Sequence, residues 1–262
     1  MDETHLHTVC EEARCPNVGE CFSKGTATIL ILGRICTRHC GFCAVEQGVP
    51  APLNEQEPEE VAQAMKKMGL RYAVVTSVTR DDLPDGGAFA FAKTIQAIRG
   101  MDPTIKIEVL VPDFEGTLSS LRIVLEESPD VLNHNIETVP RLYPEVRPQA
   151  DYNRSLNLLK KSKDLYPHVF TKSGFMLGLG ETEDEVLNLI QDLREVGCDF
   201  LTIGQYLQPR PDRLPVVRFI PPEDFDKFKK LGEEMGFKSI ASGPFIRSSF
   251  HASEMWVKKR KE

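Results

Sequence analysis

The chain has 262 residues, of which 41% are hydrophobic and 27% charged, and its formal charge is −7 at pH 7. This composition is typical of a globular protein with a sizeable core, and it excludes a disordered tail, a collagen and a small secreted scaffold. We expect no nucleic-acid partner, because the balance is acidic and no basic stripe could neutralise phosphates. The sequence contains no run of about 18 apolar residues, so we expect no membrane span. The polar first residues exclude a secretory signal. We therefore expect a cytoplasmic protein, or one of an organellar matrix in a eukaryote.

Six apolar, β-branched runs predict buried parallel strands. They lie at residues 28–34, 72–78, 105–111, 130–135, 168–177 and 199–206. Amphipathic stretches predict helices at residues 57–68, 87–98, 117–126, 153–164 and 182–196. In the last of these, Thr182 and Glu185 have the spacing of a capping box. Strand–helix alternation predicts an α/β fold, a six-stranded partial (β/α)6 TIM-like barrel, although strand counting alone leaves a flat doubly wound sheet open.

Three segments divide the chain within one structural domain. Residues 1–27 are rich in cysteine and lack strand or helix periodicity, so we expect something other than packing to hold them. Residues 28–210 form the predicted barrel core. Residues 211–262 form a C-terminal extension, which begins with a proline-rich linker and continues into a predicted helix near 222–235. We expect both end segments to cover the open end of the barrel.

Six of the seven cysteines form two triplets. Cys36, Cys40 and Cys43 have the spacing C-x3-C-x2-C directly after the first predicted strand, and the other triplet is Cys10, Cys15 and Cys21, with the spacing C-x4-C-x5-C. Structural zinc and scattered buried thiols are the alternatives, but neither spacing matches a zinc ribbon. A [4Fe–4S] cluster usually takes four thiolates, so three leave one iron open. The seventh cysteine, Cys198, lies between a helix and a strand and is interpreted as a buried core thiol.

The second triplet, with Phe42 before its last cysteine, resembles the defining motif of the radical S-adenosylmethionine (SAM) enzymes. That resemblance implies that the open iron chelates the amino and carboxylate groups of SAM. Electron transfer from the cluster then yields methionine and a 5′-deoxyadenosyl radical, which abstracts hydrogen from an unactivated C–H bond.

The first triplet resembles the auxiliary-cluster motif of the lipoyl synthase family, and the likeness covers nearly the whole chain. It continues through TSVTRDDLPDGGA (76–88), VLNHNIETV (131–139), VRPQADY (146–152), GFMLGLGET (174–182), LTIGQYLQP (201–209) and GPFIRSSF (243–250). The resemblance implies a sulfurtransferase that inserts two sulfur atoms, at C6 and C8 of an octanoyl chain on a carrier lysine. It also implies two [4Fe–4S] clusters, two SAM molecules per product, and the auxiliary cluster as the sulfur source.

In this family a serine of an Arg-Ser-Ser-Tyr motif completes the auxiliary cluster. Here the motif ends in Phe250, which keeps the ring and lacks the hydroxyl. The resemblance implies Ser249 as the ligand, with Ser248 as the alternative. A serine alkoxide is a harder and more easily protonated donor than a thiolate, so it suits a cluster that must open.

Further residues at predicted strand ends are candidates for SAM or substrate contacts. The resemblance implies that Asp85-Gly86-Gly87 receives the SAM amino group, and the alternative is a turn that opens a helix. Asn133 and Asn135 share one face of their predicted strand, Glu137 follows, and the three suit the ribose or the substrate.

Five more positions complete the candidate SAM site. Arg147 suits the SAM carboxylate, with a surface ion pair as the alternative. Gly178 and Gly180 would let the backbone approach the adenine. Gln205 and Leu207 end the sixth predicted strand and are expected at the adenosyl group, although Leu207 fits a packing role equally.

The predicted partners are an octanoylated lipoyl carrier domain or glycine-cleavage H protein, a flavodoxin- or ferredoxin-type electron donor, and an iron–sulfur carrier that rebuilds the auxiliary cluster. Three other functions are weighed against this one. A biotin-synthase-like or methylthio-transferring enzyme would place auxiliary ligands differently. An electron-transfer carrier benefits from closed cluster coordination, and a zinc-stabilised binding module would be colourless.

Overall fold

The computed structural model describes residues 7, 8, 12, 15, 17, 28–250 and 252–258. The chain divides into two compact units, Met1–His39 with Ala44–Leu132, and Cys40–Cys43 with Asn133–Glu262. No helix in the described part of the chain is long and apolar enough to cross a membrane.

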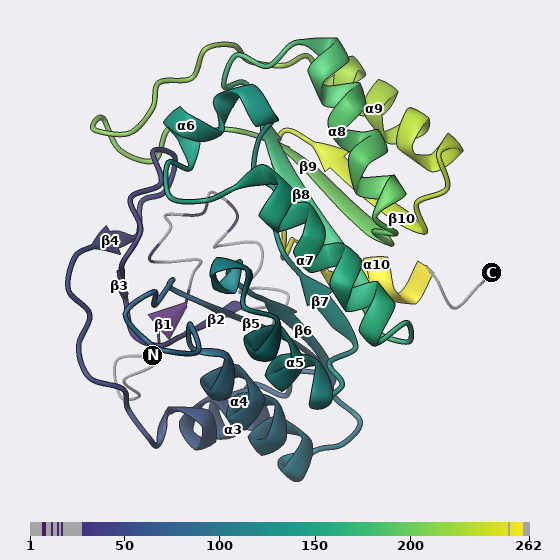
Figure 1. The fold of residues 1–262 in the computed structure, drawn as a ribbon. Coiled ribbons are helices and arrows are strands. Elements are labelled where there is room, and N and C mark those ends of the chain that lie inside the picture. Colours follow the sequence, from purple (N-terminus) through teal and green to yellow (C-terminus); the bar gives the residue numbers. More distant parts are fainter. Residues whose placement is uncertain are drawn as a thin grey trace. The chain divides into compact units, whose positions relative to one another are not determined.

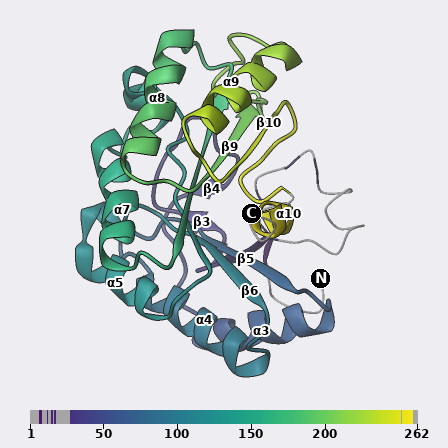
Figure 2. The same cartoon turned by 90° about the vertical axis from the view of Figure 1, so that its right-hand side faces the viewer.

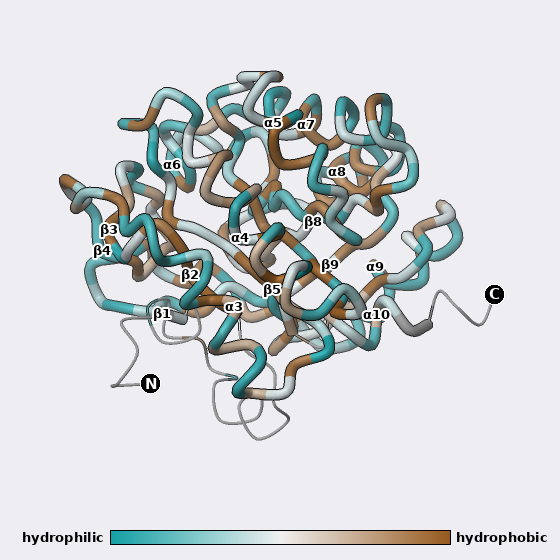
Figure 3. Tube along the Cα trace, turned by 90° about the horizontal axis from the view of Figure 1, so that it is seen from below, coloured by the Kyte–Doolittle hydropathy of each residue, from teal (hydrophilic) through white to brown (hydrophobic). Residues whose placement is uncertain are grey.

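The first unit is built on parallel strands. They are β2 (Thr28–Ile31), β5 (Tyr72–Ser77) and β6 (Lys106–Leu110), with β7 (Val131–Asn133) beginning beside β6. The register pairs Ile29 with Val75 and Val75 with Val109, and all three side chains are fully buried. Figure 3 shows β2 and β5 mainly in the brown of hydrophobic residues, as expected for strands that are covered on both faces.

A short strand lies within residues 1–27, where the sequence shows no strand periodicity: β1 (His7–Thr8) pairs antiparallel with β2. Two residues are too short for a periodic pattern, so only the pairing with β2 reveals the strand.

Three helices lie side by side in the first unit: α3 (Glu57–Lys67), α4 (Ala88–Met101) and α5 (Leu118–Glu126) (Figures 1 and 2). Each buries one apolar face, represented by Met65, Phe91 and Leu121. A second, small sheet pairs β3 (Ile35–Cys36) in parallel with β4 (Glu46–Gln47), and a 3-10 turn, η1 (Phe114–Gly116), follows β6. The unit therefore places the first cysteine of the C-x3-C-x2-C motif at the end of a strand.

The second unit repeats the same architecture. Its strands β8 (Phe170–Leu177), β9 (Phe200–Gln205) and β10 (Ser239–Gly243) run in parallel, and Leu201 of β9 pairs with both Ser173 and Ile240. The other elements are η2 (Pro140–Leu142), α6 (Tyr143–Val146), α7 (Tyr152–Leu165), α8 (Glu183–Glu195), α9 (Pro222–Glu234) and α10 (Ala252–Lys258). The tyrosine hydroxyl of α7 residue Tyr152 donates to Asp192 of α8 at 2.7 Å, which ties neighbouring helices together.

The predicted elements are confirmed, with shorter strands than expected. Each of the six predicted strands contains an observed one, and the alternation gives the expected α/β fold with mostly parallel strands. The capping box is present: the Thr182 hydroxyl accepts from the Glu185 N–H, and the Glu185 carboxylate accepts from the Thr182 N–H. Strand β10 was missed, and the exact number of barrel strands stays a prediction.

Candidate functional site

The loop after Cys36 is fastened to the end of β5. Thr37 donates to the Thr79 carbonyl through both its N–H and its hydroxyl, at 3.0 Å each, and its hydroxyl accepts from the Asp81 N–H at 3.1 Å. The Cys36 sulfur is half-buried and accepts from the Arg38 N–H at 3.4 Å. A thiol held in this way keeps its position while one face stays accessible.

A buried ion pair lies directly behind this loop. Arg38 is 4% exposed, and its Nε and Nη2 contact the two carboxylate oxygens of Asp81 at 2.7 and 2.9 Å. Its Nη2 also donates to the buried Asp113 at 2.6 Å. Burial opposes the charge on Arg38, but its hydrogen bonds to Asp81 and Asp113 outweigh this effect and hold the Arg38 pKa above its usual value. Sequence reasoning missed this arginine, although its place between two motif cysteines was a visible signal.

Asp85 caps α4, as its alternative interpretation as a turn predicted. Its carboxylate accepts from the Gly87 N–H at 2.9 Å and from the Phe89 N–H at 2.7 Å. Gly87 has a φ of 87° and a Cβ there would lie 2.3 Å from Leu32 Cδ1, so only glycine fits. The capping role accounts for Asp85 locally, and the SAM amino group at this turn stays a prediction.

The Cys40–Cys43 loop belongs to the second unit and is fixed there by its glycine. The Gly41 N–H donates to the Val146 carbonyl at 2.9 Å, and the Gly41 carbonyl accepts from the Leu214 N–H at 3.0 Å. A Cβ at Gly41 would lie 2.9 Å from Leu214 Cδ1 and 3.1 Å from the Glu145 carbonyl oxygen, so the loop packs closely on both residues. Burial raises the pKa of Tyr206 to about 12, and the nearby Cys43 acts in the same direction.

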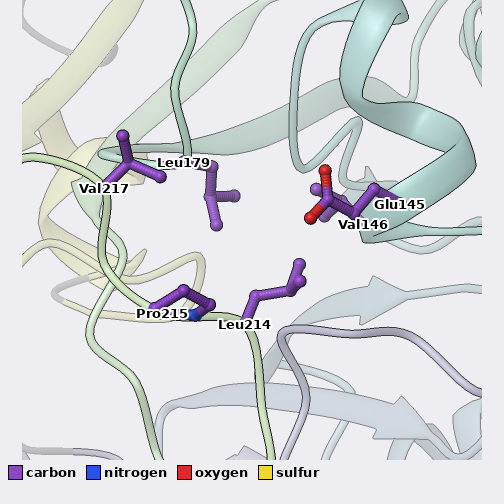
Figure 4. Close-up of a pocket in the computed structure, with 6 residues that line it drawn as sticks. All are labelled: Glu145, Val146, Leu179, Leu214, Pro215 and Val217. Atoms are coloured by element: carbon purple, nitrogen blue, oxygen red, sulfur yellow. The ribbon is translucent and has the colours of Figure 1, made fainter.

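A pocket lies beside this seat (Figure 4). Its lining is mainly apolar and consists of Glu145, Val146, Leu179, Leu214, Pro215 and Val217. In Figure 4 the Glu145 carboxylate lies on the side that faces Leu179 and Leu214. Val146 and Leu214 are the residues whose backbones hold Gly41, so the pocket is next to the Cys40–Cys43 loop.

The Gly178–Gly180 turn forms one wall of the pocket, and a buried carboxylate holds it. Glu181 accepts from the Gly178 N–H at 2.6 Å and from the Leu179 N–H at 2.9 Å. Two backbone donors on one carboxylate fix the turn that presents Leu179 to the pocket. Glu181 was not among the predicted residues, although a carboxylate directly after a G-x-G turn was a usable signal.

Gln205 is hydrogen-bonded to residues 214–220, here called the strap, which line the other side of the pocket. Its Nε2 donates to the Tyr206 carbonyl at 2.9 Å and to the Arg218 carbonyl at 3.1 Å, and its Oε1 accepts from the Ile220 N–H at 2.9 Å. The Gln205 side-chain amide is therefore hydrogen-bonded to backbone groups of the protein itself. The strap lies so close to Gly178 that a Cβ on Gly178 would be 2.5 Å from the Arg218 carbonyl oxygen. Leu207 is half-buried in the loop that follows. Contacts of both residues with the adenosyl group stay predictions.

Asn135 and Glu137 meet, although not by simple strand alternation. Strand β7 ends at Asn133, which is fully buried, and Glu137 takes a left-handed φ of 67°. The Glu137 N–H donates to the Gly174 carbonyl at 3.0 Å, and the Glu137 carbonyl accepts from the Met176 N–H at 2.9 Å, so β8 holds this strained backbone. Asn135 Nδ2 then donates to Glu137 Oε1 at 3.1 Å. Burial raises the pKa of the Glu137 carboxyl, while Arg147 and Asn135 act in the opposite direction.

Arg147 is buried, so its alternative interpretation as a surface ion pair is wrong. It is 9% exposed, and its Nη1 donates to the Asn135 carbonyl at 2.9 Å and to the Tyr143 hydroxyl at 3.3 Å. It also lies over the Tyr143 ring, 5.5 Å from the centroid. The guanidinium is therefore held in place beside the Asn135–Glu137 pair.

The Arg247–Phe250 motif contacts the Asn135–Glu137 pair through Ser248. Asn135 Nδ2 donates to the Ser248 hydroxyl at 2.6 Å, whereas the Ser249 carbonyl accepts from the Ala252 N–H at the start of α10. Asn135 Oδ1 is buried, and it has no hydrogen-bond partner among the residues that the structure describes. A Cβ at Gly174 would lie 2.3 Å from Thr202 Oγ1 and 3.2 Å from that oxygen, so the glycine lets both side chains pack closely on its backbone.

The residues present fit the groups that the sequence implies. A buried acceptor without a donor points to a missing polar partner, and Asn135 Oδ1 fits a ligand hydroxyl such as that of a ribose. Cys36, Cys40 and Cys43 are half-buried soft donors, which suit an iron–sulfur cluster. Within the described residues, no three His, Cys, Asp or Glu side chains form a site for a single metal ion.

The auxiliary triplet is only partly described. Cys15 is a half-buried free thiol, and Cys10 and Cys21 lie outside the described residues. Cys198 is confirmed as a core thiol: it is fully buried, and burial raises its pKa to about 12.

Comparisons with known proteins agree on one family. The profile of the Radical SAM superfamily matches residues 30–193. Lipoyl synthase of Caldanaerobacter subterraneus subsp. tengcongensis is 58% identical over 247 residues, covering 94% of this chain and 87% of the relative. Lipoyl synthase of Rubrobacter xylanophilus is 60% identical over 249 residues, covering 95% and 78%. That of Haemophilus influenzae is 54% identical over 248 residues, covering 94% and 78%.

Solved structures share the fold at low sequence identity. Methylornithine synthase aligns with a TM-score of 0.54 and 15% identity, covering 82% of this chain and 70% of that one. Streptococcus suis SuiB bound to S-adenosylmethionine aligns with a TM-score of 0.63 and 12% identity, covering 86% and 53%.

Proposed function

Because this chain belongs to the lipoyl synthase family of the radical SAM superfamily, we propose that it inserts sulfur at C6 and C8 of a protein-bound octanoyl-lysine chain to form the lipoyl cofactor. The chain is an enzyme of the radical SAM type, and it requires SAM and iron–sulfur clusters. When bound, a reduced [4Fe–4S] cluster and SAM supply the radical chemistry that removes hydrogen from an unactivated C–H bond. The proposal assigns two clusters to the chain and two SAM molecules to each product.

Each cluster is assigned to one cysteine triplet. Cys36, Cys40 and Cys43 hold the cluster that binds SAM, because their spacing leaves one iron open and each part of their loop has a fixed seat in its unit. The proposal gives the auxiliary, sulfur-donating cluster to the other triplet and Ser249.

The residues assigned to SAM are each supported by the local geometry around them. The pocket lined by Val146, Leu179 and Leu214 offers apolar walls next to the Cys40–Cys43 loop, which suits the adenine. The unpartnered Oδ1 of Asn135 offers an acceptor for a ribose hydroxyl.

The two charged groups of SAM are assigned to Arg147 and to the Asp85–Gly87 turn. The buried guanidinium of Arg147 suits the carboxylate, because it is always charged and hydrogen bonds to the Asn135 carbonyl and the Tyr143 hydroxyl hold it in place. The proposal places the amino group at the Asp85–Gly87 turn, with Gly86 between them, where the Asp85 carboxylate supplies negative charge.

The substrate class follows from the family, because lipoyl synthases act on lipoyl carrier proteins. We propose an octanoylated lipoyl domain or glycine-cleavage H protein as the substrate, a flavodoxin- or ferredoxin-type electron donor, and an iron–sulfur carrier for cluster repair. The compartment is proposed to be the reducing cytoplasm, in which seven thiols stay reduced.

The observation that carries the proposal is the 58–60% identity to lipoyl synthases over nearly the whole chain. Anaerobically reconstituted protein is incubated with reductant, SAM and an octanoyl-lysine peptide, and the peptide is weighed by mass spectrometry. The proposal predicts a monothiolated intermediate, followed by the dithiolated product. Cleavage of SAM without any sulfur in the peptide would contradict it.

The choice of serine has its own test. Ser248 already accepts a hydrogen bond from Asn135, so the neighbouring Ser249 hydroxyl is assigned to the cluster. Ser249→Ala is expected to lower the iron retained by the auxiliary cluster, whereas Ser248→Ala keeps that iron. The reverse pattern would transfer the ligand role to Ser248.

A further inference from the structure

A buried charge network surrounds the segment between Cys36 and Cys40. Arg38 makes a two-point contact with Asp81, which follows β5, and a third contact with Asp113, which follows β6. Asp113 is 1% exposed and Arg38 4% exposed, so little water competes with these contacts. One guanidinium thus joins the cysteine loop to the carboxyl ends of two neighbouring strands.

The network continues into a strained turn. Asp113 Oδ1 accepts from the Glu115 N–H at 3.1 Å, and both Phe114 and Glu115 take left-handed φ values, 47° and 50°. Such angles are costly for residues with a side chain, so contacts around the turn must maintain them. The anchored Asp113 carboxylate is one of those contacts.

The strained turn touches the predicted position of the SAM amino group. A Cβ on Gly86 would lie 3.1 Å from Phe114 Cδ1, so the Phe114 ring packs directly on the Gly86 backbone. Phe114 is 3% exposed and cannot move aside into solvent. A continuous path of contacts therefore runs from Cys36 through Arg38 and Asp113 to Phe114 and Gly86.

We propose that Arg38 and Asp113 form a positioning pair that fixes the first cluster cysteine relative to the Asp85–Gly87 turn, and so sets the affinity for SAM. The inference rests on the proposed function, since it assigns both ends of the path to SAM binding. Arg38 is a positioning residue, because its side chain is engaged by two carboxylates and acts through Cys36 and Gly86. Without the guanidinium, the buried Asp113 carboxylate and the partly exposed Asp81 carboxylate would repel each other, and the turn would lose its anchor.

A purely structural role makes a different prediction. If the pair only stabilised the fold, its loss would lower the melting temperature and leave SAM affinity unchanged in the folded protein. If it positions the two ends, SAM affinity falls in protein that is folded and retains its cluster. Binding and melting must therefore be measured on the same samples.

The test uses Asp113→Asn and Arg38→Lys in the reconstituted holoenzyme. Asparagine keeps the volume and one acceptor oxygen, while lysine keeps the charge and loses the two-point contact. The matched control is Asp82→Asn, which removes the neighbouring ion pair with Arg80. The Asp82 side chain is 39% exposed. Iron content, melting temperature, the dissociation constant for SAM and the electron paramagnetic resonance spectrum of the reduced cluster with SAM are recorded.

Both test variants are expected to retain iron, to bind SAM about tenfold more weakly and to change the spectrum seen with SAM. A tenfold change in affinity corresponds to about 1.4 kcal/mol. The control is expected to keep the wild-type SAM affinity and spectrum. SAM binding within twofold of wild type in either folded, iron-loaded variant would overturn the positioning role. An equal loss in Asp82→Asn would also overturn it. Wild-type protein that holds its iron and binds no SAM would contradict the proposed function itself.

Discussion

The carboxylate of Glu181 holds the turn that forms one wall of the candidate SAM pocket, and its removal should be measurable in two ways. Glu181→Ala leaves the Gly178 and Leu179 N–H groups without their acceptor, which now lies at 2.6 and 2.9 Å. A buried donor without a partner costs about 1–3 kcal/mol, so two such groups destabilise the protein by about 3 kcal/mol. For a chain of this size that corresponds to a fall in melting temperature of about 8 °C. Because Leu179 lines the pocket, SAM affinity should fall as well.

Differential scanning calorimetry and equilibrium SAM binding check this prediction against Glu183→Ala. Glu183 lies two residues further on, and its side chain is 55% exposed in an ion pair with Lys227. Exposed pairs contribute at most about 1 kcal/mol, so this control should melt near the wild-type temperature and bind SAM normally. Equal melting temperatures for the Glu181 and Glu183 variants would refute the inference that the buried carboxylate holds the turn.

Three further predictions concern the cysteines, one helix cap and the serine ligand. Cys40→Ala should lose SAM-dependent spectroscopic changes and about four irons per chain, while Cys198→Ala, in the core, keeps its iron; equal iron loss in both would contradict the assignment. Arg141 and the capping box hold the pKa of Glu185 at about 2, below its unfolded value of about 4.3. The contribution of the Glu185 charge to stability is therefore present above about pH 4.3 and is lost as the pH falls toward about 2. In urea melts, Glu185→Gln should lower the stability at pH 7 and change it little near pH 2. A stability difference that stays constant with pH would show that the charge plays no part. Ser249→Cys should assemble the auxiliary cluster and slow thiolation, and full turnover by this variant would exclude a labile oxygen ligand.

Local patterns were sufficient for most of the fold. The capping box at Thr182 and Glu185 is a contact between residues three apart, so the sequence alone specifies it. The buried strands needed only their apolar runs. Strand β10 depends on its pairing with β9, because Ser239 and Ser242 interrupt its short apolar pattern. Such a strand is defined by its neighbour in space, which no local pattern reveals.

The same distinction between local patterns and distant contacts applies to the candidate site. Spacing identified the cysteines and the glycine turns, since both are short-range features. Arg147 could not be placed from its neighbours, because its partners are the Asn135 carbonyl and the Tyr143 hydroxyl. The contact between Asn135 and Ser248 joins residues 113 positions apart and was likewise invisible in the sequence.

The origin of the inserted sulfur tests the central claim most directly. The protein is reconstituted with iron and ³⁴S-sulfide, freed of excess sulfide, and allowed a single turnover with SAM, reductant and octanoyl-lysine peptide under unlabelled conditions. Mass spectrometry should find two ³⁴S atoms in the dithiolated peptide, because the auxiliary cluster of the same chain donates both. Dithiolated peptide that carries only unlabelled sulfur would contradict the account.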